Sequence, residues 1–343
     1  PSSSAAEPAA PESQASEPAA PAEPEPTPEE TPDASAEGAE IAMITDLGTI
    51  DDKSFNQGTW EGVQQYAEAN GKTCKYYKPA SGDEDAYLSA IDLAVKGGAK
   101  VVVTPGFLFE VPIFKAQTAY PDVTFILIDG NPNDGAQPAA TYKTEKNAVG
   151  VVYAEEQPGF LAGYAAVKEG YTKLGFLGGM AVPAVVRYGY GYLQGAEYAA
   201  KELGLADGSV TVNYHYTGGF EATPEAQTLA ASWYQQGVEV IFGCGGSVGN
   251  SAMAAAATAG GKTIGVDVDQ SGESDTVITS AMKNLSGAVD KLLGQFYDGT
   301  FPGGEALIYS AADGLVGLPM ESSKFEKFTQ ADYDAICEKL KTD

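Results

Sequence analysis

The chain has 343 residues, which is enough for one large domain or two of ordinary size. Acidic residues outnumber basic ones by 47 to 20, and the net charge of -27 argues against nucleic acid or an anionic membrane surface as a partner. No apolar run approaches the roughly 18 residues that a membrane span needs. The three cysteines are far apart and there is one histidine, so we expect no disulfide scaffold, no metal and no cofactor.

Residues 1–40 differ from the remainder in composition. They hold nine prolines, nine glutamates and one aspartate, with no lysine, arginine or aromatic residue. Such a segment cannot bury enough apolar surface to offset the entropy lost on ordering. We expect a disordered, extended acidic tether, although low complexity alone also explains the composition. A tether suits a protein held at a bacterial surface by a lipid anchor, whose cysteine would lie outside this sequence.

The part that follows begins with a short apolar run, Ile41–Asp46, that is typical of a buried strand. A helix is expected over 59–70, where Trp60, Val63 and Tyr66 share one face and Gly71 ends it. The alternation continues with strands at 73–78, 100–104 and 123–129 and helices at 84–96 and 111–119. Strands alternating with helices of this length indicate parallel βαβ units.

A second series of the same kind follows residue 155. Its expected helices are 160–169, 189–203, 224–236, 251–259 and 285–297, and its expected strands are 173–178, 210–216, 238–244, 263–267 and 277–282. We therefore predict an α/β protein with two doubly wound lobes. The first lobe comprises 41–155 and about 277–305, because the second half already has a full set of strands. The second comprises 156–276 and about 306–343.

Ligands of open parallel sheets bind beyond the carboxyl ends of the strands. The predicted strands end in carboxylates, glycines and a phenylalanine: Asp46, Gly106, Asp129, the segments 217–220 and 243–246, and Asp267. Two such edges that face each other form a cleft for a small polar ligand with a flat apolar part. Helix or turn capping is a competing explanation for the aspartates, including Asp51 and Asp52. Competing explanations also exist for two other residues: Phe55 could be a core residue at the start of a helix, and Lys283 could be an exposed surface lysine.

Patterns typical of enzymes fail on inspection. Residues 245–249 have the spelling G-x-S-x-G, but the only histidine, His215, precedes the serine, whereas this motif requires a later one. The segment 260–263 resembles the end of a P-loop in the wrong context, after a helix and before a strand. The segment 267–272 resembles an EF-hand loop whose twelfth position would be Ile278, which supplies no carboxylate. We predict that the protein is not an enzyme.

The opening string IAMITDLGTIDDKSFNQ, residues 41–57, closely resembles the opening of the basic membrane protein family. Further matches follow in the same order: 125–129, 159–163, 240–246, 264–267 and 297–304. Members of this family are substrate-binding lipoproteins of ABC importers and include bacterial purine nucleoside receptors. The resemblance covers about residues 40–320. It implies a type I periplasmic-binding-protein fold, with a hinge and a ligand cleft between two lobes.

The resemblance also implies roles for individual residues. Phe55 and Phe220 match two rings that hold a purine base, one from each lobe, with Tyr214 and Tyr216 close to Phe220. The other matched contacts are Asp46 and Asn56 for the base, Asp267 and Lys283 for the ribose, and Asp129 with the backbone of Gly245 and Gly246 elsewhere in the cleft. The stretch 181–192, with Arg187, has no match in the family pattern.

The predicted function is therefore capture of a nucleoside, with a purine base, and its delivery to an ABC permease and its ATPase subunit. The protein would act outside the cytoplasm, tethered to the bacterial cytoplasmic membrane. A carboxylate-rich site also predicts nucleosides over nucleotides. Two alternatives stay open: a sensor for a nucleoside, sugar or other heterocycle, and a nucleoside hydrolase using Asp51 and Asp52.

Overall fold

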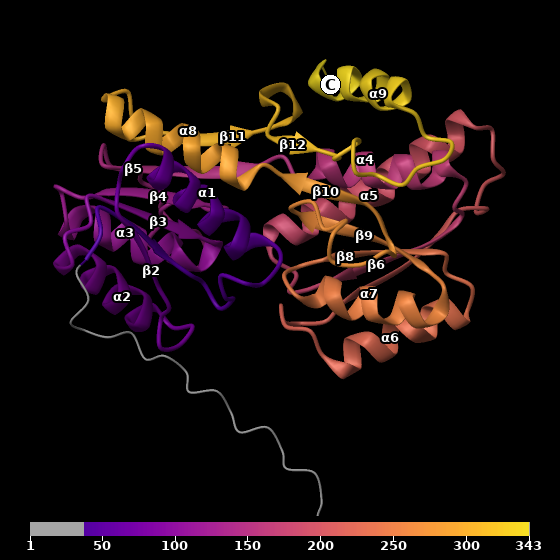
Figure 1. Ribbon diagram of the computed structural model, residues 1–343, viewed down its shortest axis with the longest axis horizontal. Coiled ribbons are helices and arrows are strands. Elements are labelled where there is room, and N and C mark those ends of the chain that lie inside the picture. The colour runs from indigo at the N-terminus through magenta and orange to yellow at the C-terminus, as the bar shows by residue number, and fades with distance from the viewer. Residues whose placement is uncertain (1–37, 343) are drawn as a thin grey trace, which may run out of the picture. The chain divides into compact units, whose positions relative to one another are not determined.

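The computed structural model describes residues 38–342, whose strands form two six-stranded sheets (Figure 1). The first sheet has the order β11 (Ala306–Tyr309), β5 (Ala148–Tyr153), β4 (Thr124–Ile128), β3 (Val101–Pro105), β1 (Ile41–Ile44) and β2 (Cys74–Tyr77). The second has the order β12 (Val316–Gly317), β10 (Val277–Lys283), β9 (Lys262–Asp267), β8 (Val240–Cys244), β6 (Lys173–Gly178) and β7 (Thr211–Tyr216). The prediction of two doubly wound α/β halves is confirmed. All but the last three residues of the predicted tether lie outside the described residues.

The two sheets share one plan. In the order across each sheet, β1 to β5 occupy the places that β6 to β10 occupy in the other. Neighbouring strands are parallel throughout, except that β12 runs antiparallel to β10. The carboxyl ends of the parallel strands therefore lie along one edge of each sheet, where a doubly wound fold binds its ligand.

The strands form because short, almost continuous apolar runs are buried on both faces. Every residue of β1, β3 and β8 is buried. This is the pattern of a parallel sheet that helices cover on both sides. The edge strand β7, by contrast, has no buried residue. Its sequence alternates in polarity for that reason.

Helices separate the strands along the chain. They are α1 (Phe55–Ala69), α2 (Glu84–Lys96), α3 (Glu110–Ala119), α4 (Glu156–Glu169), α5 (Pro183–Glu202), α6 (Pro224–Gln235), α7 (Val248–Ala259), α8 (Leu285–Asp298) and α9 (Gln330–Thr342), with 3-10 turns at Phe107–Phe109 and Ala311–Asp313. The side chains of Asp83, Thr223 and Asn284 cap α2, α6 and α8 by accepting backbone N–H groups. Among the described helices, none combines the length and the apolar character that crossing a bilayer requires.

The chain passes between the sheets at three places, and these change the predicted lobe boundaries. The passages are residues 154–155 between β5 and α4, Asn284 between β10 and α8, and 310–315 between β11 and β12. The strand 277–283, predicted to return to the first lobe, pairs with β9 in the second sheet. Only α8 returns, and it packs against α1. The segment 306–309, predicted in the second lobe, pairs with β5 in the first sheet.

Helix α5 begins six residues before its predicted start. It includes several glycines because its backbone packs directly against the backbone of α4. A Cβ atom on Gly191 would lie 2.0 Å from the carbonyl oxygen of Glu156, and one on Gly195 would lie 1.9 Å from that of Phe160. Only glycine permits this approach. The helix-breaking cost of glycine is offset here by the close packing of the two helices.

Replacing Gly191 with alanine is expected to lower the free energy of unfolding by about 1–3 kcal/mol, since the added methyl group would force the two helix backbones apart. The measurement is chemical denaturation of the two proteins. The control is Gly294→Ala in α8, where the nearest atom to the new Cβ would be 4.0 Å away. Alanine at that position should be neutral or stabilising by about 0.5–1 kcal/mol. Equal stability of Gly191→Ala and the parent protein would contradict this account of α5.

Candidate functional site

A cavity of about 600 Å³ lies among the loops that follow strands of both sheets. The first lobe lines the cavity with the loop after β1, the start of α1 and the residues after β3 and β4. The second lobe lines it with the start of α5, the loops after β7 and β8, and the ends of β9 and β10. All of the predicted ligand-binding residues line it: Asp46, Phe55, Asn56, Gly106, Asp129, Phe220, Gly245, Gly246, Asp267 and Lys283. The structure therefore brings together residues that are up to 237 positions apart, from Asp46 to Lys283.

Two aspartates occupy equivalent places in the two sheets. Asp129 follows β4 and Asp267 ends β9, and both adopt the left-handed backbone conformation, with φ of 59° and 66°. This conformation is unfavourable for residues other than glycine, and it persists where the surrounding structure imposes it, often at functional sites. Neither carboxylate caps a following turn, as the competing explanation required. Instead, Asp129 Oδ2 accepts from Lys283 Nζ, and Asp267 Oδ2 accepts from Ser54 Oγ at 2.5 Å.

The loop between β1 and α1 is organised by Asp52. Its carboxylate accepts the backbone N–H groups of Ser54, Asn56 and Gln57, together with the side-chain amide of Asn56. These bonds begin α1 at Phe55, four residues before the predicted start, and they confirm the capping interpretation of Asp52. Asp51 is exposed and accepts from Thr49 Oγ1. Of this pair, Asp52 lines the cavity with both carboxylate oxygens hydrogen-bonded, and Asp51 does not line it.

Asn56 serves mainly to hold Asp46. Its Nδ2 donates to Asp46 Oδ1 at 2.8 Å and to Asp52 Oδ2 at 3.0 Å, and its Oδ1 accepts the backbone N–H of Asp46. Both amide hydrogens of Asn56 are thereby used. The predicted contact from Asn56 to a base would have to rely on its oxygen, whereas Asp46 keeps one carboxylate oxygen for a ligand.

The free oxygen of Asp46, Oδ2, lies beside Gly106, where an added Cβ would be 3.1 Å away. Gly106 has φ of 116°, so the chain needs glycine here both for its backbone and to leave this oxygen open. Burial raises the pKa of Asp46 to about 6, against the hydrogen bonds from Gly48 and Asn56 that lower it. A group with this pKa changes charge in the range where cells and their surroundings differ in pH.

The two predicted phenylalanines both line the cavity, and each is half-buried. Phe55 is the first residue of α1, and Phe220 lies in the loop after β7. A Cβ on Gly245 would be 3.2 Å from the ring of Phe220, so this glycine allows the ring to pack close to the backbone. Tyr214 and Tyr216 hydrogen-bond to each other, and neither lines the cavity.

Lys283, at the end of β10, is surrounded by three carboxylates. Its Nζ lies 2.5 Å from Asp129 Oδ2 and 3.6 Å from oxygens of both Glu155 and Asp267, and its side chain is 3% exposed. Burial lowers the pKa of Lys283, but the three carboxylates, Asp129 first, outweigh burial and raise it. Burial also raises the pKa of Asp129, and Lys283 opposes this. The competing interpretation of Lys283 as an exposed surface residue is wrong, since the side chain is buried.

Two residues of this cluster were missed from the sequence. Glu155 lies in the first passage between the sheets and is fully buried, and its Oε2 accepts from Arg187 Nε at 2.5 Å. Arg187, on α5, lines the cavity. The sequence does contain an indication of this site, because Glu155 and Glu156 follow closely after an apolar strand, as the other carboxylates do. The strand at 148–153 was not predicted, so this indication was not recognised.

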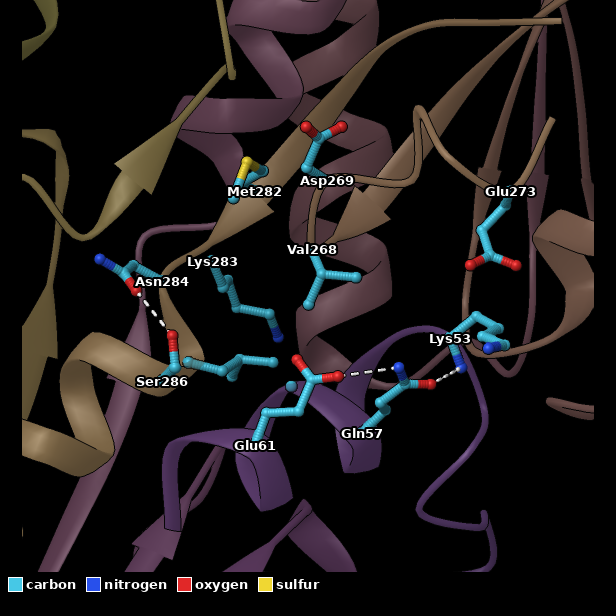
Figure 2. Close-up of a pocket in the computed structure, with 12 residues that line it drawn as sticks. Lys53, Gln57, Glu61, Val268, Asp269, Glu273, Met282, Lys283, Asn284 and Ser286 are labelled. Atoms are coloured by element: carbon cyan, nitrogen blue, oxygen red, sulfur yellow. Dashed lines mark hydrogen bonds between the residues drawn. The ribbon is translucent and has the colours of Figure 1, made fainter. Parts of the chain in front are cut away.

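The two lobes also touch through the segment before α1. Ser54 bonds to Asp267 as described, and Gln270, which is fully buried, donates from Nε2 to the backbone oxygen of Lys53 at 2.7 Å. A smaller cavity of about 320 Å³ opens beside this contact and includes Gln57, Glu61 and Ser286 (Figure 2). Lys283 borders both cavities, but none of the other predicted site residues lines the smaller one. The larger cavity is therefore the candidate site.

The larger cavity is acidic and has no metal centre among residues 38–342, since no group of three His, Cys, Asp or Glu side chains there could hold an ion. Six acidic side chains line it, namely Asp46, Asp52, Glu110, Asp129, Glu221 and Asp267, against two basic ones, Arg187 and Lys283. Both basic side chains are already paired with carboxylates. Such a surface favours ligands that donate hydrogen bonds and disfavours anions.

Residues 39–342 match the model of the Bmp family, described as ABC transporter substrate-binding protein, PnrA-like. The ABC transporter nucleoside-binding protein BmpA of Lactococcus lactis subsp. cremoris is 28% identical over 308 residues, which cover 83% of this chain and 82% of that protein. Basic membrane protein A2 of Borrelia garinii subsp. bavariensis is 30% identical over 276 residues, covering 79% and 77%. An ABC transporter solute-binding protein from Aeropyrum pernix K1 has a similar structure, with a TM-score of 0.72, 26% identity and coverage of 87% and 85%.

Proposed function

This chain belongs to the Bmp family of PnrA-like ABC transporter substrate-binding proteins, and from this premise we propose that its cleft captures a purine nucleoside. The observation that carries the proposal is a cavity that Phe55 and Phe107 line from the first lobe and Phe220 from the second, together with carboxylates at several strand ends. The similarity to a nucleoside-binding protein of Lactococcus lactis supports the same ligand class. An extracytoplasmic protein with a lipid anchor, delivering its ligand to a permease, is the setting we propose.

Each part of a nucleoside finds a chemical partner in the cavity. A base stacked on Phe55 and Phe220 would gain about 1–3 kcal/mol from each ring. The open oxygen of Asp46 accepts an N–H of the base, and the carboxylates of Asp129 and Asp267 accept sugar hydroxyl protons in charge-assisted bonds. Because residues of both lobes contact the ligand, its binding would favour the closed arrangement over an open one.

We expect guanosine to bind at least about 100-fold more tightly than its 5′-monophosphate, because six acidic side chains line the cavity and both basic ones are already paired with carboxylates. Isothermal titration calorimetry with guanosine, the monophosphate, free guanine and ribose measures this directly. Guanine and ribose separate the contribution of the stacked base from that of the sugar. Absence of guanosine binding would refute the proposed ligand, and tighter binding of the monophosphate would refute the electrostatic argument.

The hydrogen bonds of Asp52 disfavour a hydrolase that uses this cleft. Both carboxylate oxygens of Asp52 already accept backbone N–H groups at the start of α1, so they are not available to act as an acid or base. Prolonged incubation of the protein with inosine, followed by chromatography, should therefore release no free hypoxanthine. Release that disappears in an Asp52→Asn variant would support the enzyme instead.

A further inference from the structure

Two hydrogen bonds join the lobes at the segment that precedes α1. Gln270 donates from Nε2 to the backbone oxygen of Lys53 at 2.7 Å, and Ser54 donates from Oγ to Asp267 Oδ2 at 2.5 Å. Gln270 and Ser54 are fully buried, and neither lines the larger cavity. Both bonds run from protein to protein, so they depend on the approach of the two lobes and not on contact with a ligand.

Gln270 is held in place by its own lobe. Its Oε1 accepts the backbone N–H of Val266 at 2.9 Å, and its own backbone N–H donates to Ser280 Oγ at 3.0 Å. A Cβ atom on Gly265 would lie 2.6 Å from Gln270 Oε1, so glycine at that position makes room for the amide. The Nε2 donor is therefore positioned by contacts within the second lobe, which an opening of the cleft would leave intact.

The acceptor is likewise fixed by the first lobe. Lys53 has the left-handed backbone conformation, with φ of 58°, which is unfavourable for a residue other than glycine. Its backbone N–H donates to Gln57 Oε1 at 3.0 Å (Figure 2), and the N–H of Ser54 donates to Asp52 Oδ1 at 2.9 Å. Such strain persists where the surrounding structure imposes it, and it is common in clamps and switches. Here the strained residue presents its carbonyl oxygen to Gln270.

We propose that the bonds from Gln270 to Lys53 and from Ser54 to Asp267 form a latch, which favours the closed arrangement of the lobes. Opening breaks both bonds, because the donor and acceptor of each belong to different lobes. The apparent dissociation constant of a ligand is its intrinsic value divided by the fraction of protein that is closed. A residue that acts only on this fraction changes the affinity of every ligand by one factor. Gln270 is then a positioning residue that acts on binding without touching the ligand.

The first test compares the parent protein with Gln270→Met, which keeps the length of the side chain and removes the donor. Calorimetry gives the affinities of guanosine, inosine and 2′-deoxyguanosine, a choice of ligands that rests on the proposed function. All three should weaken by the same factor of about two to ten, as expected for the loss of one hydrogen bond that favours closure. Losses that differ among the three nucleosides would overturn the latch and assign Gln270 to a ligand contact.

The second test needs no ligand. Small-angle scattering of the free proteins should give a larger radius of gyration for Gln270→Met than for the parent, because a smaller fraction of the variant is closed. Ser54→Ala removes the other bond from the first lobe and should have the same effect, which keeps the test open if Gln270→Met does not fold. Melting curves identify any variant that has lost its fold.

Thr263→Val is the matched control, since it removes a hydrogen bond of the buried Thr263 to Thr276, at 3.0 Å, that stays within the second lobe. It should leave the affinities and the radius of gyration unchanged. Unchanged affinities together with an unchanged radius in folded Gln270→Met would overturn the latch. Failure of the parent protein to bind guanosine would instead overturn the proposed function, and the scattering of the free proteins would then decide for or against the latch.

Discussion

Replacing Lys283 with methionine is expected to lower the free energy of unfolding by about 3–5 kcal/mol, which is typical when one partner of a buried ion pair is removed. The substitution keeps the length of the side chain and removes its charge. Asp129, Asp267 and Glu155 would then share a buried site with only Arg187 left to neutralise them. Chemical denaturation of the two proteins at pH 7 measures the effect.

The control for this substitution is Lys201→Met, which removes an exposed lysine and should change the free energy of unfolding by less than about 0.5 kcal/mol. Adding Asp129→Asn to Lys283→Met removes one of the uncompensated charges. The double variant should therefore be more stable than Lys283→Met alone. If Lys283→Met were as stable as the parent protein, the cluster would have to be hydrated, and its description as a buried network would be wrong.

Nucleoside affinity is expected to fall about tenfold between pH 7 and pH 5, because Asp46 must be ionised to accept an N–H of the base and its pKa is about 6. Protonation of Asp46 competes with the ligand at the lower pH. Calorimetry with guanosine at several pH values measures the profile. In Asp46→Asn the profile should be flat in this range, although the affinity itself would be lower.

The contribution of Asp46 to the stability of the ligand-free protein should fall as the pH rises, whereas the nucleoside affinity should increase. Burial raises the pKa of Asp46 in the folded state above its ordinary value of 3.8, so the folded protein binds this proton more tightly than the unfolded chain does. The contribution of Asp46 to stability is therefore present below about pH 4 and is lost as the pH rises through 6. The difference in unfolding free energy between the parent protein and Asp46→Asn isolates this contribution. A difference that is constant from pH 4 to 7 would show that Asp46 is not desolvated.

Much of the candidate site could be predicted because it depends on strand ends. Asp46, Asp129 and Asp267 each follow a continuous apolar run, and parallel topology places such residues along one edge. The motif around Phe55 then gave individual roles through resemblance to a family. The strand 148–153 was missed although AVGVVY is a short apolar run, because no helix separates it from the preceding strand, and Glu155 was missed with it. The lobe boundary at 277–283 was wrong because pairing with β9 is a property of the assembled sheet and leaves no local signal.

The roles of Asn56 and Arg187 are likewise products of packing. The family resemblance implies a ligand contact for Asn56, whereas in the structure both of its amide hydrogens are donated to Asp46 and Asp52. Arg187 lies in the first turns of α5, which precede the predicted helix start at residue 189. The close approach of that helix to α4, which depends on Gly191 and Gly195, is what brings Arg187 to Glu155.

The common plan of the two sheets has a consequence for the direction in which a ligand lies. Asp129 and Asp267 occupy matching places, so the frame alone would accept a molecule either way round. The strands beside them break this equivalence, because β10 ends in Lys283 where its counterpart β5 ends in Tyr153. The two halves therefore present different groups at matching places, and a nucleoside bound as proposed would have one preferred orientation in the cleft.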